Sequence, residues 1–294
     1  MDKTLFVTWT MDCETVAEES PATGGPASWE LSQQAMRGYV EALAAREQRV
    51  TLFLIPRLAK AQSAILLDLQ EAGVDLGMHM HPQTTDLGYD RHLGQLPAEL
   101  QRELLHRGRD RIAQVIGQAP TSFRPGCFSA SEETFALLVE AGFTQGSVSL
   151  PGRVLPEVGA VWAGAEPFAH WASASHGLQA GDLPFLELPT AVDLKDAAGP
   201  AQSPGDARHL RLEREGILDW GPDLIRRHLA RQVEMNWWLK CLVVMTHNTR
   251  RYDDPQDQYR RNLEGIADAI EEVALGMELR LQPATLAEVR AAVS

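Results

Sequence analysis

The chain has 294 residues, 44% of them hydrophobic and 23% charged, a composition typical of a globular protein with a sizeable core. Its 40 acidic residues outnumber its 27 basic ones, and the formal charge of −13 disfavours non-specific binding to nucleic acid or anionic lipid. No apolar run approaches the ~20 residues that a membrane-spanning helix needs. The sequence therefore predicts neither nucleic acid nor a membrane as a partner.

Hydrophobic periodicity predicts strands that alternate with helices through the first half of the chain. In chain order these are strand 5–11, helix 29–46, strand 50–55, helix 56–72, strand 74–77, helix 97–116, strand 122–123, helix 131–141 and strand 143–150. From 151 to about 221 the pattern loosens, and only 184–192 resembles a strand, as is typical of long active-site loops. The last predicted elements are helix 222–240, strand 241–245, helix 256–275 and a final strand–helix pair.

This alternation predicts parallel strands joined by crossover helices. Seven or eight such units favour a closed or nearly closed α/β barrel over an open sheet. No linker divides the chain, so we expect one domain over 1–294, with a long irregular active-site segment at about 151–221. No glycine fingerprint of a nucleotide cofactor follows any predicted strand.

The cysteines and the N-terminus indicate where the protein works. The three cysteines, Cys13, Cys127 and Cys241, match neither a zinc knuckle nor a disulfide framework, and such a low, odd count suggests a reducing compartment. The first residues lack the features of a signal peptide. We therefore expect a cytoplasmic protein. Cys13 and Cys127 lie beside polar patches, but we expect small buried side chains there rather than nucleophiles.

Two acidic residues come at the end of the first predicted strand. Asp12 and Glu14 are two residues apart, so on a strand both project from the same face while Cys13 points away. Carboxylates after so apolar a run are costly unless they are paired or bind a metal. The alternative is that the strand has already ended and both are solvated.

His79 and His81 repeat this spacing at the end of the third predicted strand. Two neutral imidazoles on one strand face suit zinc and similar ions, which makes a metal site the favoured interpretation. The alternative is one core histidine and one loop histidine. Pro82 stiffens the loop that follows, and Gln83 and Asp86 are candidate partners for the metal ligands.

Arg124 and His247 are the remaining candidate site residues. Arg124 precedes a proline at a strand end, where a guanidinium could hold a carboxylate, although a surface arginine is the simpler interpretation. His247 ends the most apolar strand and is placed for proton transfer near neutral pH. We expect the other histidines to be mostly solvated; they are His92, His106, His170, His176, His209 and His228.

The order of these patches resembles that of the NodB-type polysaccharide deacetylases, the deacetylase branch of carbohydrate esterase family four. Residues 10–14 (TMDCE) are similar to the first motif of the family, in a variant with one residue between the acids. Residues 74–82 (VDLGMHMHP) are similar to the second, 123–131 (FRPGCFSAS) to the third and 244–247 (VMTH) to the last. The similarity spans almost the whole chain.

The resemblance implies a distorted or incomplete (β/α)7–8 barrel and one divalent metal ion, zinc first, with cobalt or nickel as alternatives. It implies that Asp12 is the general base, that Arg124 orients Asp12 and that His247 is the general acid. Glu14, His79 and one further imidazole would bind the metal. The family's usual spacing would put that ligand at Gln83, and we assign His81 because the pair here is His-x-His.

The implied reaction is metal-dependent hydrolysis of an amide, most simply N-deacetylation of a sugar or glycan precursor. The absence of an export signal favours a small or lipid-linked glycan precursor over a cell-wall polymer. Two alternatives remain: a His-x-His amidohydrolase that acts on another small amide, and a barrel that binds glycan without turnover. The sequence leaves the substrate, the native metal and a homo-oligomer open.

Overall fold

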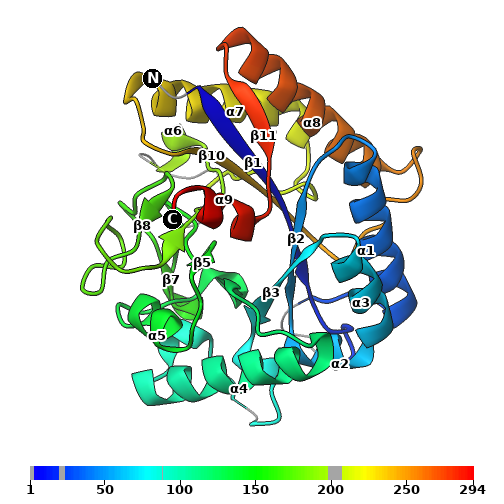
Figure 1. Cartoon of the computed structure of the whole chain (residues 1–294), viewed down its shortest axis with the longest axis vertical. Helices are drawn as coiled ribbons and strands as arrows, with labels where there is room; N and C mark the ends of the chain where they lie inside the picture. Colours follow the sequence, from blue (N-terminus) through cyan, green and yellow to red (C-terminus); the bar gives the residue numbers. More distant parts are fainter. Residues whose placement is uncertain (1–2, 20–23, 88, 198–206) are drawn as a thin grey trace.

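The fold is a curled sheet that forms an incomplete barrel, with helices packed around its outside (Figure 1). The computed structural model describes residues 3–19, 24–87, 89–197 and 207–294. The strands are β1 (Thr4–Cys13), β2 (Val50–Leu54), β3 (Asp75–Met80), β4 (Ser122–Pro125), β5 (Gln145–Gly146), β6 (Val154–Leu155), β7 (Ala160–Val161), β8 (His170–Trp171), β9 (Leu186–Glu187), β10 (Lys240–His247) and β11 (Arg280–Pro283).

The α-helices are α1 (Trp29–Ala44), α2 (Pro56–Ala61), α3 (Ser63–Glu71), α4 (Ala98–Ile116), α5 (Thr134–Glu140), α6 (Leu194–Ala197), α7 (Ile217–Glu234), α8 (Gln258–Gly276) and α9 (Leu286–Ala292). The 3₁₀ turns in the described part of the chain are η1 (Pro82–Thr84), η2 (Leu93–Gln95), η3 (Gly126–Phe128) and η4 (Pro156–Val158). Among the described residues no helix is long and apolar enough to cross a bilayer.

The strands of the main sheet follow the order β10-β1-β2-β3-β4-β5-β9-β8, and β11 also pairs with β1. All of these pairings are parallel except that of β8 with β9. β6 and β7 form a separate antiparallel pair. The predicted incomplete α/β barrel is thus confirmed, since the path of strands does not close among the residues that the structure describes.

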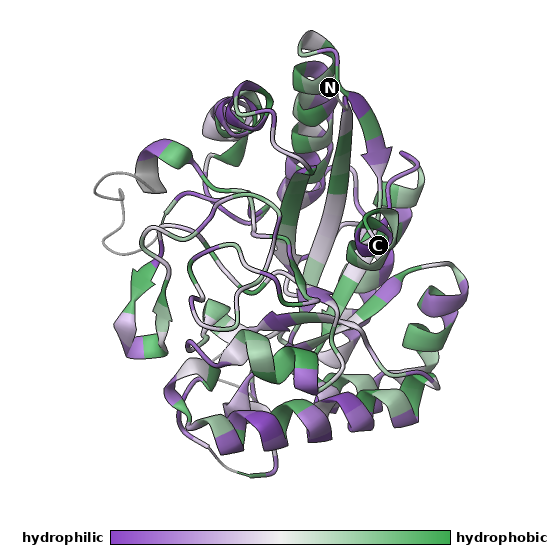
Figure 2. Ribbon diagram, turned by 60° about the vertical axis from the view of Figure 1, so that its left-hand side comes forward, coloured by the Kyte–Doolittle hydropathy of each residue, from purple (hydrophilic) through white to green (hydrophobic). Residues whose placement is uncertain are grey.

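Alternation along β1 separates two apolar layers. Its outward residues, such as Leu5, Val7 and Trp9, pack in the large core beneath the helices. The inward Phe6 belongs to a second, smaller cluster with Phe53 and with Leu286 of α9. Figure 2 shows hydrophobic residues along the central strands, while hydrophilic and hydrophobic residues alternate around the outer helices.

Helix α9 closes the end of the barrel at which the parallel strands begin. The Leu286 amide donates to Thr51 Oγ1 at 3.1 Å, and the Asp75 carboxylate accepts from Thr51 at 3.1 Å and from Ser122 at 2.8 Å. These polar groups satisfy one another inside the barrel. The opposite end, where the strands terminate, is left for the polar residues of the predicted site.

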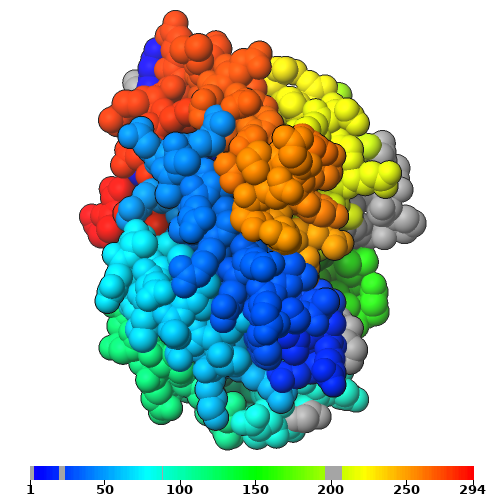
Figure 3. Space-filling model, turned by 90° about the vertical axis from the view of Figure 1, so that its right-hand side faces the viewer, coloured from blue at the N-terminus to red at the C-terminus, as the bar shows by residue number. Residues whose placement is uncertain are grey.

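Segments distant in sequence complete the outer wall. In Figure 3 the region of α1 lies beside the orange C-terminal residues that lead into α8. An ion pair of 2.5 Å joins Arg46 to Asp268 across this boundary. A Cβ on Gly38 would lie 2.6 Å from the Asp253 backbone nitrogen, so only glycine permits α1 to pack this closely.

The boundaries depart from the sequence predictions in informative places. β1 continues to Cys13, so Asp12 lies on the strand and Glu14 directly after it. The helix predicted over 56–72 is divided at Gln62, where φ is −123° and the backbone leaves the helical region. α7 begins at Ile217, earlier than the predicted start at Pro222, so Pro222 lies inside the helix, where it has no N–H for the helical hydrogen-bond ladder.

The irregular segment differs most. The predicted strand 143–150 is reduced to the two residues of β5, and 184–192 to the two residues of β9. Short strands that the periodicity does not predict, β6, β7 and β8, occur between them. Two-residue strands are too short to produce an alternating pattern. Residues 198–206 of the predicted segment lie outside the described residues.

Candidate metal centre and active site

The polar residues at the ends of four strands meet at one end of the barrel. β10, β1, β2, β3 and β4 are consecutive in the sheet, and the register pairs Asp12 with His247 and His79 with Arg124. Residues paired in a parallel register project from the same face, and this face is the inside of the barrel. The sheet therefore brings together side chains that are more than 200 residues apart in sequence.

Glu14, His79 and His81 form a buried cluster of metal-ligand type. Glu14 Oε1 lies 3.2 Å from His79 Nε2 and 3.1 Å from His81 Nε2, and all three side chains are at most 3% exposed. Ligands about 2.1 Å from a tetrahedral zinc ion are roughly 3.4 Å apart. The spacing of these donor atoms therefore fits a divalent ion of that size.

Hydrogen bonding in the cluster leaves atoms free for a cation. His79 Nδ1 donates to the Arg124 carbonyl oxygen at 2.9 Å, which places the lone pair of the neutral ring on Nε2, facing Glu14. Glu14 Oε2 is buried and has no hydrogen-bond partner among the described residues. An unpartnered carboxylate oxygen is costly in a protein interior, and a cation would satisfy it.

Charges within the cluster keep Glu14 ionised. Burial by itself raises the pKa of this carboxyl group, but His81 and His79 together hold it well below its usual range. Burial likewise lowers the pKa of His79, while Asp12 and Glu14 outweigh that effect and raise it. The cluster therefore combines an ionised carboxylate with two imidazoles, a donor set that suits zinc and similar ions.

Asn248 holds Glu14 in place. The Glu14 amide donates to Asn248 Oδ1 at 2.9 Å, and Asn248 Nδ2 donates to the Glu14 carbonyl oxygen at 2.9 Å and to Ser32 Oγ at 2.8 Å. Sequence reasoning missed this role, although the position of Asn248 directly after His247 was an available signal. Both amide atoms of the asparagine are used to fix the backbone of a candidate ligand.

Asp12 is held by Arg124. Arg124 Nη1 donates to Asp12 Oδ1 at 2.7 Å and to Thr10 Oγ1 at 2.9 Å, and the guanidinium lies over the Phe53 ring at 4.5 Å from its centroid. Burial by itself raises the pKa of Asp12, but the Arg124 charge, with His79 and His247, holds it below its usual value. Asp12 is therefore an oriented carboxylate that is fully ionised near neutral pH.

His247 lies opposite Asp12 and is oriented by Glu213. His247 Nε2 is 3.9 Å from Asp12 Oδ2, and Nδ1 is 3.1 Å from Glu213 Oε1, which also accepts from the His247 amide at 2.6 Å. Burial by itself raises the pKa of Glu213, but His247, assisted by Arg211, brings it down to about 2. Glu213 lies in the irregular segment, where no periodicity marks it, and sequence reasoning missed it.

The structure thus brings all six predicted site residues into one contact network, and their individual roles remain predictions. The side chains of Asp12, Glu14, His79 and His81 are almost completely buried, whereas that of His247 is 14% exposed. Gln83, the alternative ligand position, lies in η1, and its Oε1 has no hydrogen-bond partner among the described residues. The imidazole of His81 approaches Glu14, with Nε2 3.1 Å from Oε1.

The cysteines agree only in part with expectation. All three are free, and Cys13 is buried in an apolar layer as predicted; Cys241 is buried as well. Cys127 is half-buried rather than buried, in η3 beside the metal-ligand cluster. It lies there because η3 crosses the end of β3 directly after Arg124.

A separate cavity of about 510 Å³ lies on the outside of the sheet, between α2, α4 and the loop after β3. Apolar residues such as Met80 and Leu104 line it, with Arg57, Lys60 and Arg107 among its charged residues. Met80 projects from the face of β3 opposite to His79 and His81. The cavity is therefore distinct from the metal-ligand cluster.

Comparison with family models gives a match over part of the chain. The model described as "Polysaccharide deacetylase" matches residues 25–146, a range that contains His79, His81 and Arg124 but not Asp12, Glu14 or His247. The resemblance to the NodB-type polysaccharide deacetylases is thereby confirmed. Comparison of the sequence with curated proteins gives no significant match.

Solved structures share the fold over essentially the whole chain. A protein from Mycobacterium smegmatis described as a polysaccharide deacetylase is 18% identical, with a TM-score of 0.62, and the match covers 100% of this chain and 91% of that one. The PuuE allantoinase is 12% identical, with a TM-score of 0.58, and 98% and 90% of the two chains are covered. A further protein described as a polysaccharide deacetylase, from Pseudomonas aeruginosa PAO1, is 13% identical, with a TM-score of 0.57 and coverage of 98% and 90%.

Proposed function

We propose that the chain is a metal-dependent hydrolase of carbon–nitrogen bonds that removes an N-acyl group from a sugar or glycan precursor. The observation that carries the proposal is the approach of one carboxylate oxygen of Glu14 to both His79 Nε2 and His81 Nε2, at 3.2 Å and 3.1 Å. Beside this cluster lie an ionised carboxylate, Asp12, and an imidazole, His247. The match to the polysaccharide deacetylase model supports a deacetylase.

Glu14, His79 and His81 would hold the ion. A bound divalent cation supplies Lewis acidity, which polarises an acyl oxygen and makes water more acidic. Zinc suits the one-oxygen, two-nitrogen donor set, and cobalt or nickel are alternatives with similar ligand preferences. The two hydrogen bonds between Asn248 and the backbone of Glu14 hold Glu14 in position beside the two histidines.

Asp12 acts as the general base. Its Oδ1 is fixed by Arg124 at 2.7 Å, and its Oδ2 is the oxygen nearer to His247. The guanidinium keeps the carboxylate ionised and fixes its plane, so that Oδ2 can accept the proton of an attacking water. Arg124 is a positioning residue in this scheme, because its own contacts are with Asp12, Thr10 and aromatic rings.

His247 acts as the general acid. Its Nδ1–H is committed to Glu213, which leaves Nε2 to carry the proton that passes to the leaving amine. The side chain of His247 is 14% exposed, which supports its access to a substrate. The acid and the base therefore approach the reacting carbon from neighbouring strands, β10 and β1.

The test is a deacylase screen over N-acetylated sugars, sugar nucleotides and short amides, run with and without added zinc, cobalt or nickel. Allantoin belongs in the screen because a protein named as an allantoinase shares this fold. We expect turnover that a chelator abolishes and added metal restores. Turnover that a chelator leaves unchanged would overturn the proposal.

Variants separate the roles of the residues. His247→Ala should reduce turnover by about 10²-fold to 10⁴-fold while the metal content is retained. His79→Ala should lose turnover together with the ion that Glu14, His79 and His81 would hold. Metal binding without turnover on any substrate in the screen would favour the alternative of a barrel that binds glycan without catalysis.

A further inference from the structure

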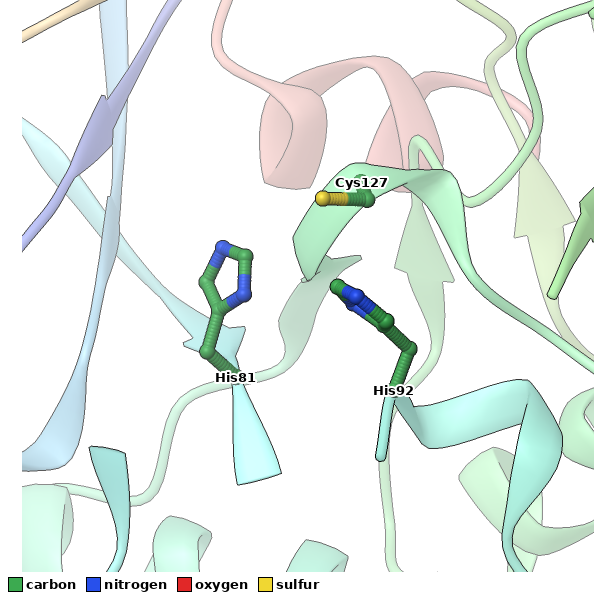
Figure 4. Close-up of side chains that lie close together, drawn as sticks. All are labelled: His81, His92 and Cys127. Carbon is green, nitrogen blue, oxygen red and sulfur yellow. The ribbon is translucent and has the colours of Figure 1, made fainter. Parts of the chain in front are cut away.

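A second group of metal-ligand side chains adjoins the cluster around Glu14. One ligand atom each from His81, His92 and Cys127 lies within 4.8 Å of the others. The three residues come from separate segments: the end of β3, the residue before η2 and the turn η3 (Figure 4). In Figure 4 the thiol of Cys127 points toward the space between the two imidazole rings.

His81 belongs to both groups through its two ring nitrogens. Its Nε2 faces Glu14 at 3.1 Å, whereas its Nδ1 is buried and has no hydrogen-bond partner among the described residues. The residue is only 2% exposed. A neutral imidazole in a protein interior normally uses both nitrogens, one as donor and one as acceptor, so the unpartnered Nδ1 points to a ligand.

His92 also has a ring nitrogen without a hydrogen-bond partner among the described residues. This nitrogen is Nδ1, and it is buried. The backbone amide of His92 is fixed by Gln95 Oε1 at 3.1 Å, so the ring is held on an ordered turn. Two unpartnered ring nitrogens and a thiol are therefore collected in one small volume.

The backbone of η3 is adapted to bring Cys127 to this position. A Cβ on Gly126 would lie 2.3–2.4 Å from atoms of the His81 ring, so only glycine allows the chain to cross so close to the imidazole. The backbone of Cys127 adopts the left-handed helical conformation, with φ 55° and ψ 14°. This conformation costs a non-glycine residue about 1 kcal/mol. Strained backbone of this kind is concentrated at functional sites.

We propose that His81 Nδ1, His92 and Cys127 form a second site for a thiophilic divalent ion such as zinc or cobalt. Zinc takes both imidazole nitrogen and thiolate sulfur as ligands, and three protein ligands leave a fourth position for water or another ligand. His81 is shared, with Nε2 serving the Glu14–His79 site and Nδ1 serving the new one. Filling the second site releases the Cys127 thiol proton, and filling both sites also releases the remaining ring proton of His81.

This site goes beyond the proposed hydrolase and does not depend on it, apart from the shared ring. The Glu14–His79 side contains no sulfur, so a sulfur-specific signal reports the second site alone. Cobalt bound to a thiolate gives a charge-transfer absorption that cobalt bound to nitrogen and oxygen lacks. Metal stoichiometry and this absorption are both readouts that require no substrate.

The experiment titrates metal-free protein with Co²⁺ and measures the near-ultraviolet absorption and the metal content after removal of free ion. Wild-type protein should bind two ions per chain and show the thiolate absorption. Cys127→Ser should bind one ion and lose the absorption, whereas His79→Ala should bind one ion and retain it. Cys241→Ala, a change at a buried cysteine on β10, should bind two ions and retain the absorption.

Circular dichroism of each metal-free variant would confirm that it is folded. A wild-type chain that binds cobalt without the thiolate absorption would overturn the proposal, as would an absorption that survives in Cys127→Ser. A single ion per chain with the absorption would support the second site and refute the Glu14–His79 site instead. The proposed hydrolase can fail without the second site. A chain that binds two ions but turns over no substrate would refute the hydrolase and support the second site. Turnover by a chain that binds one ion and shows no thiolate absorption would refute the second site alone.

Discussion

His247 Nδ1 lies 3.1 Å from Glu213 Oε1, and the same oxygen accepts a hydrogen bond from the His247 amide at 2.6 Å. One carboxylate oxygen therefore fixes both the backbone and the ring of the candidate acid. The tautomer that this contact selects puts the reactive nitrogen, Nε2, on the side of Asp12. This relationship makes Glu213 a positioning residue that can be tested.

Replacement of Glu213 by glutamine should lower kcat roughly 10-fold to 100-fold, because the amide can still accept a hydrogen bond but no longer carries the charge that stabilises a protonated His247. The metal content should be unchanged, since Glu213 does not contact Glu14, His79 or His81. Steady-state kinetics and metal analysis of the same preparations measure the two effects. Glu215→Gln, a change at an exposed glutamate of the same segment, is the control. Unchanged kcat, or loss of metal, would contradict the assignment.

The buried ion pair between Arg124 and Asp12 should show strong energetic coupling. Arg124→Met leaves the Asp12 carboxylate buried without its guanidinium, so we expect the free energy of unfolding to fall by about 3–5 kcal/mol. Asp12→Asn combined with Arg124→Met removes that uncompensated charge, so the double variant should be more stable than the sum of the single effects. Urea unfolding of metal-free protein measures all three. Additive effects would show that the pair is not coupled.

Gly126→Ala should weaken metal binding because its Cβ would meet the His81 ring at 2.3–2.4 Å. The ring must shift or the turn must move, which we expect to cost about 1–3 kcal/mol of stability. Calorimetric titration with zinc and thermal unfolding measure the two consequences. Gly276→Ala, at the end of α8 where a Cβ meets nothing within 4 Å, should leave metal binding unchanged. Equal zinc affinities of the two variants would refute the close approach.

Two buried groups should give opposite dependences of stability on pH. Burial raises the pKa of Glu187 to about 7 despite hydrogen bonds from Ser149 and the Val148 amide, so folding takes up a proton between about pH 4.5 and 7. The contribution of Glu187 to stability is thus greatest at low pH and is lost as the pH rises toward 7. Burial lowers the pKa of His228 to about 4, so its contribution is lost as the pH falls from 6.5 toward 4.

Variants at the two positions should each change how the free energy of unfolding depends on pH. For Glu187→Gln, the difference in unfolding free energy, variant minus wild type, should increase by about 3 kcal/mol between pH 4.5 and 7, because 2.5 units of pKa difference are removed. His228→Gln should show the opposite trend between pH 4 and 6.5. Urea unfolding across this pH range gives both curves, with Glu71→Gln, at an exposed glutamate, as the control. Parallel curves for Glu187→Gln and wild type would refute the shift.

The sequence by itself determined the main strands and helices, because strands such as β1 and β10 and helices such as α1 and α8 have long periodic patterns set by local alternation and helical spacing. It also placed Asp12, His79, Arg124 and His247 at strand ends, since parallel strands must terminate at a common edge. The two-residue strands β6, β7 and β8 were not predictable from it, because their formation depends on neighbouring strands rather than on their own pattern.

Only the tertiary structure decided which groups touch. The His-x-His spacing led to His81 being assigned in place of Gln83, but only the fold shows that His81 Nε2 lies 3.1 Å from Glu14 Oε1. Glu213 and Asn248 act through contacts across 34 and 234 residues of sequence, and no local pattern encodes such contacts. The position of Cys127 depends on a left-handed turn that packs against one imidazole ring. Side-chain chemistry can be identified from sequence, but distances between side chains are set by the packing of the whole sheet.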